Sequence, residues 1–390
     1  IAISATLIYV LLSGKEIEKA GANVSDYYAL LFFVLCGVSI LSSFNGLLML
    51  FLGIEILSIP LYILTGSDKR NLKSNEASLK YFLMGAFSTG IMLMGIALIY
   101  GATGIFSLGG HAMAPSSGLI RPSFLEVAGL ILLFVSMCFK VSAAPFHFWT
   151  PDVYDGAPAV FTSFMATIVK AAGFIAFVRL FDMHTQILGP TWHILLAFVI
   201  VATLLIGNIT AVFQQSVKRM LAYSSIAQAG FMLFALYSIN DLAKEGLLLY
   251  SVAYSLATIG IFAVLIKMND YTFDGFNGLA KTQPALALAT TVCLLSWAGI
   301  PLTAGFFAKY YMLASMVKAG GPIWLVILAM LFAAVSVYYY FRVIQAMYFK
   351  EGDAETAPVT SVFKTVLLLL AALIILFGIF PSIVLNWFYF

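Results

Sequence analysis

Five ionisable side chains stand inside long apolar stretches of this sequence. They are one glutamate and four lysines: Glu55, Lys80, Lys140, Lys170 and Lys309. A charge at the centre of a bilayer costs at least ~2.5–3.5 kcal/mol on the membrane-insertion scale, so such residues are rare and are usually functional. Their number in one chain therefore indicates a site.

Buried lysines and a buried glutamate are suited to moving protons. Burial disfavours the ammonium and a nearby carboxylate favours it, so a lysine holds or releases a proton according to how close its partner is. We interpret Glu55 and Lys140 as a switch pair, and Lys170 and Lys309 as the next stations. His147 is the relay residue we expect between them, because imidazole titrates near neutral pH.

Structural roles are the alternative for several of these residues. Lys80 stands near a predicted helix start, where a lysine can extend to the membrane surface. His147 can instead hydrogen-bond carbonyls freed by a neighbouring helix break. We interpret Asp152 and Asp155 as helix caps or solvated loop residues rather than ligands.

The composition agrees with a membrane protein. The chain has 390 residues, of which 62% are hydrophobic and 9% charged, against about 45–50% and about 25% in soluble domains. These values exclude an ordinary cytosolic enzyme, a disordered protein and, with a net charge of only +3, a nucleic-acid binder. The chain opens at Ile1 inside an apolar run with no signal-peptide pattern, so we expect the natural N-terminus to lie further upstream.

The apolar runs predict an all-α polytopic membrane protein, with about eleven complete spanning helices and one partial helix. Helices are the natural spanning element because the bilayer core offers no water to the backbone. The runs are 1–13, 27–43, 45–65, 79–100, 124–147, 157–181, 191–213, 217–238, 245–267, 284–316, 321–348 and 360–388.

Two of these runs are interrupted by helix breakers beside a lysine. Pro145, Pro151 and Pro158 follow Lys140, and Gly299, Pro301 and Gly305 precede Lys309. Proline removes a backbone donor and clashes with the preceding turn, and inside a membrane such breaks persist only where protein or water covers them. Interrupted helices in two halves are typical of inverted-repeat transporters with a midplane site, although simple proline kinks are the alternative.

The basic residues predict the orientation. Ten lie in or beside the odd-numbered connections and four in or beside the even-numbered ones, starting from connection 14–26. The odd set is Lys15, Lys19, Lys69, Arg70, Lys73, Lys218, Arg219, Lys267, Lys281 and Lys350; the even set is Arg121, Arg179, Lys244 and Lys318. The positive-inside rule then places the odd connections in the cytoplasm or its equivalent.

No cofactor motif accompanies these features. The sequence has no GxGxxG, no P-loop, no HExxH and no Cys/His metal spacing. We therefore expect no metal, nucleotide or other cofactor bound by this chain.

Three segments resemble a known family, and the resemblance covers most of the chain from about Leu48 to Lys350. They are FKVSAAPFHFWTPDVYDGAPAVFTSFMATIVKAAGF (139–174), QQSVKRMLAYSSIAQAGF (214–231) and GIPLTAGFFAKYYML (299–313). All three resemble the antiporter-like membrane subunits of respiratory complex I. The third is similar to subunit N among them, because the sister subunit M is expected to carry a glutamate at the position of Lys309.

The resemblance implies a fold with two inverted five-helix repeats and two broken helices. It places the first repeat at 27–181, the second at 191–348 and a C-terminal transmembrane helix at 360–388, within one transmembrane domain (1–390). It also assigns the family's essential glutamate to Glu55 and its relay lysines to Lys80, Lys140, Lys170 and Lys309.

The function implied is that of a proton-translocating membrane subunit of an NADH:quinone oxidoreductase. NADH, FMN, iron–sulfur clusters and quinone are then expected in partner subunits, and the partners are other complex I membrane subunits, including sister antiporter-like subunits, and the lipid bilayer. The expected location is the bacterial plasma membrane, with an organellar inner membrane as the alternative. A multisubunit cation/proton antiporter, a membrane-bound hydrogenase-type complex and a structural scaffold remain alternative functions.

Overall fold

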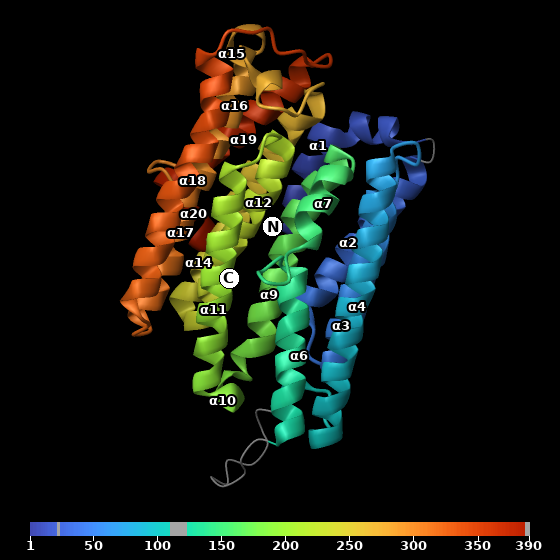
Figure 1. Cartoon of the computed structure of the whole chain (residues 1–390), viewed down its shortest axis with the longest axis vertical. Helices are drawn as coiled ribbons and strands as arrows, with labels where there is room; N and C mark the ends of the chain where they lie inside the picture. The colour runs from blue at the N-terminus through green and yellow to red at the C-terminus, as the bar shows by residue number, and fades with distance from the viewer. Residues whose placement is uncertain (22–23, 110–122, 387–390) are drawn as a thin grey trace.

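Long helices make up almost the whole of the computed structural model, which describes residues 1–21, 24–109 and 123–386 (Figure 1). Within that part of the chain, nine helices are long and apolar enough to cross a membrane. Each predicted apolar run contains a helix, so the all-α membrane fold is confirmed.

The nine candidate spans follow the chain in order. They are α2 (Val24–Ser43), α3 (Leu47–Thr65), α4 (Leu72–Thr103), the continuous α8–η1–α9 (Ala159–Asp182), α11 (Pro190–Val212), α12 with α13 (Val217–Ser238), α14 (Asp241–Lys267), α18 (Ile323–Phe349) and α19 (Ser361–Ile379). The remaining helices are α1 (Ala2–Ala20), α6 (Phe124–Lys140), α7 (Trp149–Gly156), α10 (Thr185–Leu188), α15 (Leu279–Thr282), α16 (Pro284–Ala298), α17 (Ala304–Lys318) and α20 (Ser382–Leu385).

The two ends of the chain differ from the sequence prediction. The first helix was expected to end near residue 13, but α1 continues to Ala20 through lysines and glutamates, which are good helix formers. The C-terminal helix was predicted to span 360–388, but α19 ends at Ile379, ahead of Pro381. The short α20 follows, and residues 387–390 lie outside the described part, as does Arg121 of the orientation count.

Three helical segments form the buried centre of the protein. About 94% of the α14 window is buried, and 89% of both α8–α9 and α12–α13, against 28% for α2 and 33% for α4. Helix α14 packs on α8, α16, α17 and α19, so it has no face left for lipid. A helix that is apolar all round belongs in such a place, and polar side chains on these segments are shielded from both lipid and water.

Two helix pairs are built in the same way. A Cβ atom added to Gly37 of α2 would lie 2.7 Å from the backbone nitrogen of Leu57 on α3. A Cβ atom added to Gly207 of α11 would lie 2.6 Å from the backbone nitrogen of Ala227 on α12. Gly37 and Gly207 are as far apart in the sequence as their contact residues, Leu57 and Ala227. The missing side chains let the helix backbones touch in both pairs.

The starts of α3 and α12 are also alike. The Leu47 backbone nitrogen donates to the Phe106 carbonyl at 2.8 Å, and the Val217 nitrogen donates to the Tyr271 carbonyl at 2.8 Å. Figure 1 shows that α3 starts at the end of the molecule near α10, whereas α12 starts at the opposite end, near α15. Similar pairs that run in opposite directions agree with the predicted inverted repeats, which remain a prediction.

Replacing Gly37 with alanine is expected to destabilise the protein by about 1–3 kcal/mol, because the added methyl group must push two helix backbones apart. The measurement is the thermal unfolding midpoint of the purified protein in detergent. Gly90→Ala is the matched control, because a Cβ on that exposed α4 glycine meets no atom within 4 Å. Equal midpoints for the two variants would contradict the close-packing role of Gly37.

Candidate functional site

The first helix break lies between α6 and α7, directly after Lys140. Its backbone groups are satisfied by protein: the Ala144 nitrogen donates to Thr203 Oγ1 of α11 at 2.9 Å, and Trp149 Nε1 donates to the Phe139 carbonyl at 3.0 Å. Inside a bilayer a break is tolerated only with such partners. The predicted interruption is confirmed, and it holds Lys140 at the end of a helix inside the protein.

Lys140 is buried and donates a hydrogen bond from Nζ to Ser58 Oγ of α3. Glu55 lies one helical turn before Ser58, is half-buried, and interacts electrostatically with Lys140. Within the described residues, no carboxylate lies within 4.0 Å of the Lys140 ammonium. The expected Glu55–Lys140 ion pair is therefore open in this structure, and a serine hydroxyl occupies the place beside the lysine.

Lys170 lies at the centre of the molecule, at the first residue of α9. A one-turn π-helix, η1 (Met165–Val169), precedes it, a feature found often at functional sites. Its Nζ donates to the Ser225 carbonyl at 2.7 Å and to Ser225 Oγ at 2.9 Å, and lies 5.8 Å from the centroid of the Tyr254 ring. A carbonyl, a hydroxyl and a ring face surround this lysine in place of a carboxylate.

Lys309 follows the second break, which separates α16 from α17. Its Nζ donates to the carbonyls of Trp297 at 2.8 Å and Ala298 at 3.0 Å, and lies 4.6 Å from the centroid of the Phe231 ring. These carbonyls end α16, where the helix dipole favours a cation. Gly299 has φ +82° and no room for a side chain against Lys309, so the break itself shapes the lysine's pocket.

A buried polar network joins the Lys170 region to Lys309. Gln228 of α12 donates from Nε2 to the Trp297 carbonyl and to Tyr340 Oη, each at 3.0 Å. Its Oε1 accepts from Tyr250, and Tyr340 is hydrogen-bonded to Ser224, which adjoins Ser225. These contacts link Lys170 to Ser225, and link the next residue, Ser224, through Tyr340 and Gln228 to the carbonyl that also binds Lys309.

This network was missed from the sequence. Its members are uncharged, so no bilayer cost marks them as unusual. The run AYSSIAQAG (222–230) is polar for a buried helix and was the one available signal, but it entered only as part of the family resemblance.

The other two candidates lie apart from this network. His147 is buried, its Nδ1 has no hydrogen-bond partner among the described residues, and the ring interacts with the backbone of Pro145 at the break, which agrees with the structural alternative. The Lys80 side chain is 41% exposed and forms ion pairs with Glu76 at 2.7 Å and Asp152 at 2.8 Å.

Asp152 has a larger part than the cap or loop role we expected. It binds Arg219 Nη2 at 2.9 Å as well as Lys80, and thereby ties α7 to both α4 and α12. In the described ranges, no cluster of three or more His, Cys, Asp or Glu side chains is placed to hold a metal ion.

Comparison with known proteins gives the family. The profile of the NADH:quinone oxidoreductase/Mrp antiporter transmembrane family matches residues 45–336, a stretch that contains every candidate residue above. The chain belongs to this family. Together with the nine candidate spans of the described residues, this membership makes the chain a multi-pass inner-membrane protein.

Individual relatives agree with the resemblance to subunit N. The chain is 44% identical to the NADH-quinone oxidoreductase subunit N of Cytophaga hutchinsonii, over 98% of this chain and 84% of the relative. It superposes on a chain of respiratory complex I from Thermus thermophilus with a TM-score of 0.86 and 36% identity, covering 99% of this chain and 84% of that one. A chain of an archaeal membrane-bound sulfane sulfur reductase gives a TM-score of 0.84 at 29% identity, covering 93% and 74%.

Replacing Gln228 with leucine is expected to destabilise the protein by about 1–3 kcal/mol, because the Tyr250 and Tyr340 hydroxyls and the Trp297 carbonyl lose a buried partner. The thermal unfolding midpoint in detergent measures the effect. Gln215→Leu is the control, since Gln215 is exposed. A midpoint for Gln228→Leu that equals the control would argue against a buried network at this position.

Proposed function

We propose that the chain is a proton-translocating membrane subunit of an NADH:quinone oxidoreductase, in which protons move through buried glutamate and lysine residues. The observation that carries the proposal is the set of buried polar contacts that lies between Lys170 and Lys309, on α12, α16 and α18. Its relatives named NADH-quinone oxidoreductase subunit N support the assignment to this complex.

The candidate residues form the relay in this proposal. Lys140, Lys170 and Lys309 are the proton-carrying stations, with Glu55 as the charge that modulates Lys140. Lys80 and His147 are included as relay residues, Lys80 at the exposed ion-pair cluster and His147 at the first break. The two inverted repeats, 27–181 and 191–348, are supported by the matched pairs α2–α3 and α11–α12.

The switch in this mechanism is the distance between Glu55 and Lys140. When the glutamate approaches, the lysine holds its proton; when Ser58 binds the ammonium and no carboxylate of the described residues lies within ion-pair distance, as in this structure, the lysine can pass the proton on. Moving one charge across 100 mV costs ~2.3 kcal/mol, and a hundredfold change in proton affinity corresponds to about 2.7 kcal/mol. The change in the proton affinity of Lys140 when one ion pair closes or opens can therefore match the energy needed to move a proton across the membrane potential.

The energy source lies outside this chain in the proposal. NADH, FMN, iron–sulfur clusters and quinone belong to partner subunits, and their redox chemistry changes the charge next to the relay. This chain is then a non-redox subunit, whose partners are the other membrane subunits of the complex, including sister antiporter-like subunits.

Two related functions share this fold and family. A subunit of a multisubunit cation/proton antiporter would exchange sodium for protons without a redox partner, and a hydrogenase-type or sulfur-reducing complex would use another electron donor. The lysine at position 309 and the high identity to subunit N relatives favour the NADH:quinone oxidoreductase.

Lys140→Ala is expected to reduce proton pumping coupled to NADH oxidation by about tenfold or more while the complex still assembles, because the methyl group cannot carry a proton. The measurement is pumping into inverted membrane vesicles, normalised to the amount of assembled complex. Lys318→Ala, at an exposed lysine, is the control. Full pumping by Lys140→Ala would reject this lysine as a station.

Affinity purification through this chain in mild detergent is expected to recover a large assembly that reduces quinone with NADH. Co-purifying chains are identified by mass spectrometry, and activity is assayed with and without sodium. Recovery of antiporter-like chains alone, with sodium-dependent exchange and no NADH oxidation, would replace this proposal with the cation/proton antiporter.

A further inference from the structure

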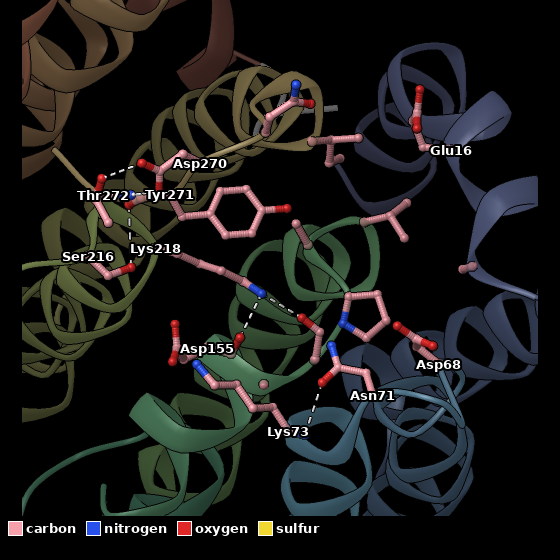
Figure 2. Close-up of a pocket in the computed structure, with 18 residues that line it drawn as sticks. Glu16, Asp68, Asn71, Lys73, Asp155, Ser216, Lys218, Asp270, Tyr271 and Thr272 are labelled. Atoms are coloured by element: carbon pink, nitrogen blue, oxygen red, sulfur yellow. Dashed lines mark hydrogen bonds between the residues drawn. The ribbon is translucent and has the colours of Figure 1, made fainter. Parts of the chain in front are cut away.

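A cavity of about 610 Å³ lies where the ends of several helices meet (Figure 2). It is lined by residues of α1, the start of α4, the end of α7, the start of α12 and the segment after α14. Asn71, Lys73, Asp270 and Thr272 at its edge are exposed, so the cavity opens to the surface. It lies at the end of the molecule whose connections we predict to face the cytoplasm, and it has room for on the order of twenty water molecules at ~30 Å³ each.

One lysine reaches into the middle of this cavity. Lys218 is only 4% exposed, and its Nζ donates to the carbonyls of Asp155 at 2.8 Å and Ala157 at 2.7 Å (Figure 2). It also lies 5.3 Å from the centroid of the Tyr271 ring. From the sequence it was counted only as a basic residue in or beside an odd-numbered connection, and the structure shows in addition that it is buried, because the chain between α7 and α8 folds over it.

The surroundings of Lys218 match those of the relay lysines. Lys170, Lys218 and Lys309 each donate to a backbone carbonyl next to an aromatic ring, and within the described residues none has a carboxylate at ion-pair distance. An ammonium and a neutral amine both donate to a carbonyl, so such a pocket accepts the lysine in either state. Lys267 differs, because the Glu16 carboxylate binds it at 2.5 Å.

Lys218 lies on the same face of α12 as the serine that binds Lys170. Ser225, which accepts from Lys170, lies two helical turns after Lys218 on the same face of α12, about 10 Å along the axis. Tyr154 of α7 is buried and interacts with Ser225, and its neighbour in sequence supplies one of the Lys218 carbonyls. The end of α7 therefore contacts Lys218 directly and also contacts the serine that binds Lys170.

We propose that Lys218 is a further proton-carrying residue, which takes protons from water in this cavity and passes them towards Lys170. The inference rests on the proposed function and extends it by one station. Carboxylates at the cavity gather protons: Asp68, Asp155 and Asp270 line it, and hydrogen bonds from Thr272 lower the pKa of Asp270 below its ordinary value, which keeps it charged.

The transfer moves a proton and no electrons. An N–H bond of the Lys218 ammonium breaks, its proton passes along hydroxyl groups and water to the neutral Lys170 amine, and an N–H bond forms there. Lys218 then regains a proton from hydronium in the cavity, so each passage consumes one proton from the cytoplasmic side.

Lys218→Arg separates proton transfer from structural support. Arginine keeps the positive charge and the donors to both carbonyls but does not release a proton. In the assembled complex, pumping per NADH is expected to fall by about tenfold or more, as for a lost proton-transfer group. Lys267→Arg is the matched control, because that lysine is also buried at the same end of the molecule but is held by a carboxylate. Normal pumping by Lys218→Arg would overturn the proposal.

A second variant tests the same role without placing the larger arginine side chain in the pocket. Lys218→Cys is made in a Cys36→Ser background, which removes the exposed native cysteine. Labelling with 2-aminoethyl methanethiosulfonate restores a titratable amine, whereas the trimethylammonium reagent adds a fixed charge. We expect the amine alone to restore pumping. Full pumping without label, equal rescue by both reagents, or no rescue by either after confirmed labelling would overturn the proposal.

Lys170→Met distinguishes this inference from the proposed function. If Lys170→Met loses pumping while both Lys218 variants pump normally, the role of Lys218 is rejected and the proposed relay through Lys170 is kept. Normal pumping in Lys170→Met would reject the lysine relay as a whole.

Discussion

The constraint on which this structure depends is that backbone carbonyls freed by a helix break must be satisfied away from water. The break between α16 and α17 frees the carbonyls of Trp297 and Ala298, and Lys309 and Gln228 supply the donors. The gap between α7 and α8 frees the carbonyls of Asp155 and Ala157, and Lys218 supplies the donor. These two breaks thereby create sites for the buried amines of Lys309 and Lys218, and each amine stabilises the break that holds it.

In the proposed relay, this reciprocity lets Lys218 and Lys309 change their protonation state without destabilising the fold. A lysine fixed by a carboxylate, like Lys267 with Glu16, would leave an uncompensated charge if it lost its proton, and breaking such a buried pair costs about 3–5 kcal/mol. A lysine held by carbonyls keeps its hydrogen bonds in both states. In the proposed relay, the buried hydroxyl and amide groups of Ser224, Tyr340 and Gln228 lie between the stations Lys170 and Lys309.

The sequence predicted the parts of the site that carry a charge within an apolar run. Lys140, Lys170 and Lys309 were identified because burying a charge is costly, and both breaks were identified from proline and glycine. The burial of Lys218 was not predicted, because this lysine adjoins a connection in sequence and only the tertiary fold brings the end of α7 over it. The separation of Glu55 from Lys140 depends on how α3 is rotated against α6, which hydropathy does not report. Gln228 and Tyr340 are neutral, so no bilayer cost marked them, and the polar run 222–230 that contains Gln228 entered only through the family resemblance.

The central claim is that amines held by helix-break carbonyls pass protons, and the most direct test is at Lys309. Lys309→Arg in the assembled complex keeps a cation and donors beside the Trp297 and Ala298 carbonyls but removes the ability to release a proton. Pumped protons per NADH oxidised, measured in proteoliposomes, are the quantity to compare with the unaltered complex. The account predicts that the variant assembles and that its pumping falls sharply. An unchanged proton yield from an assembled Lys309→Arg complex would contradict it.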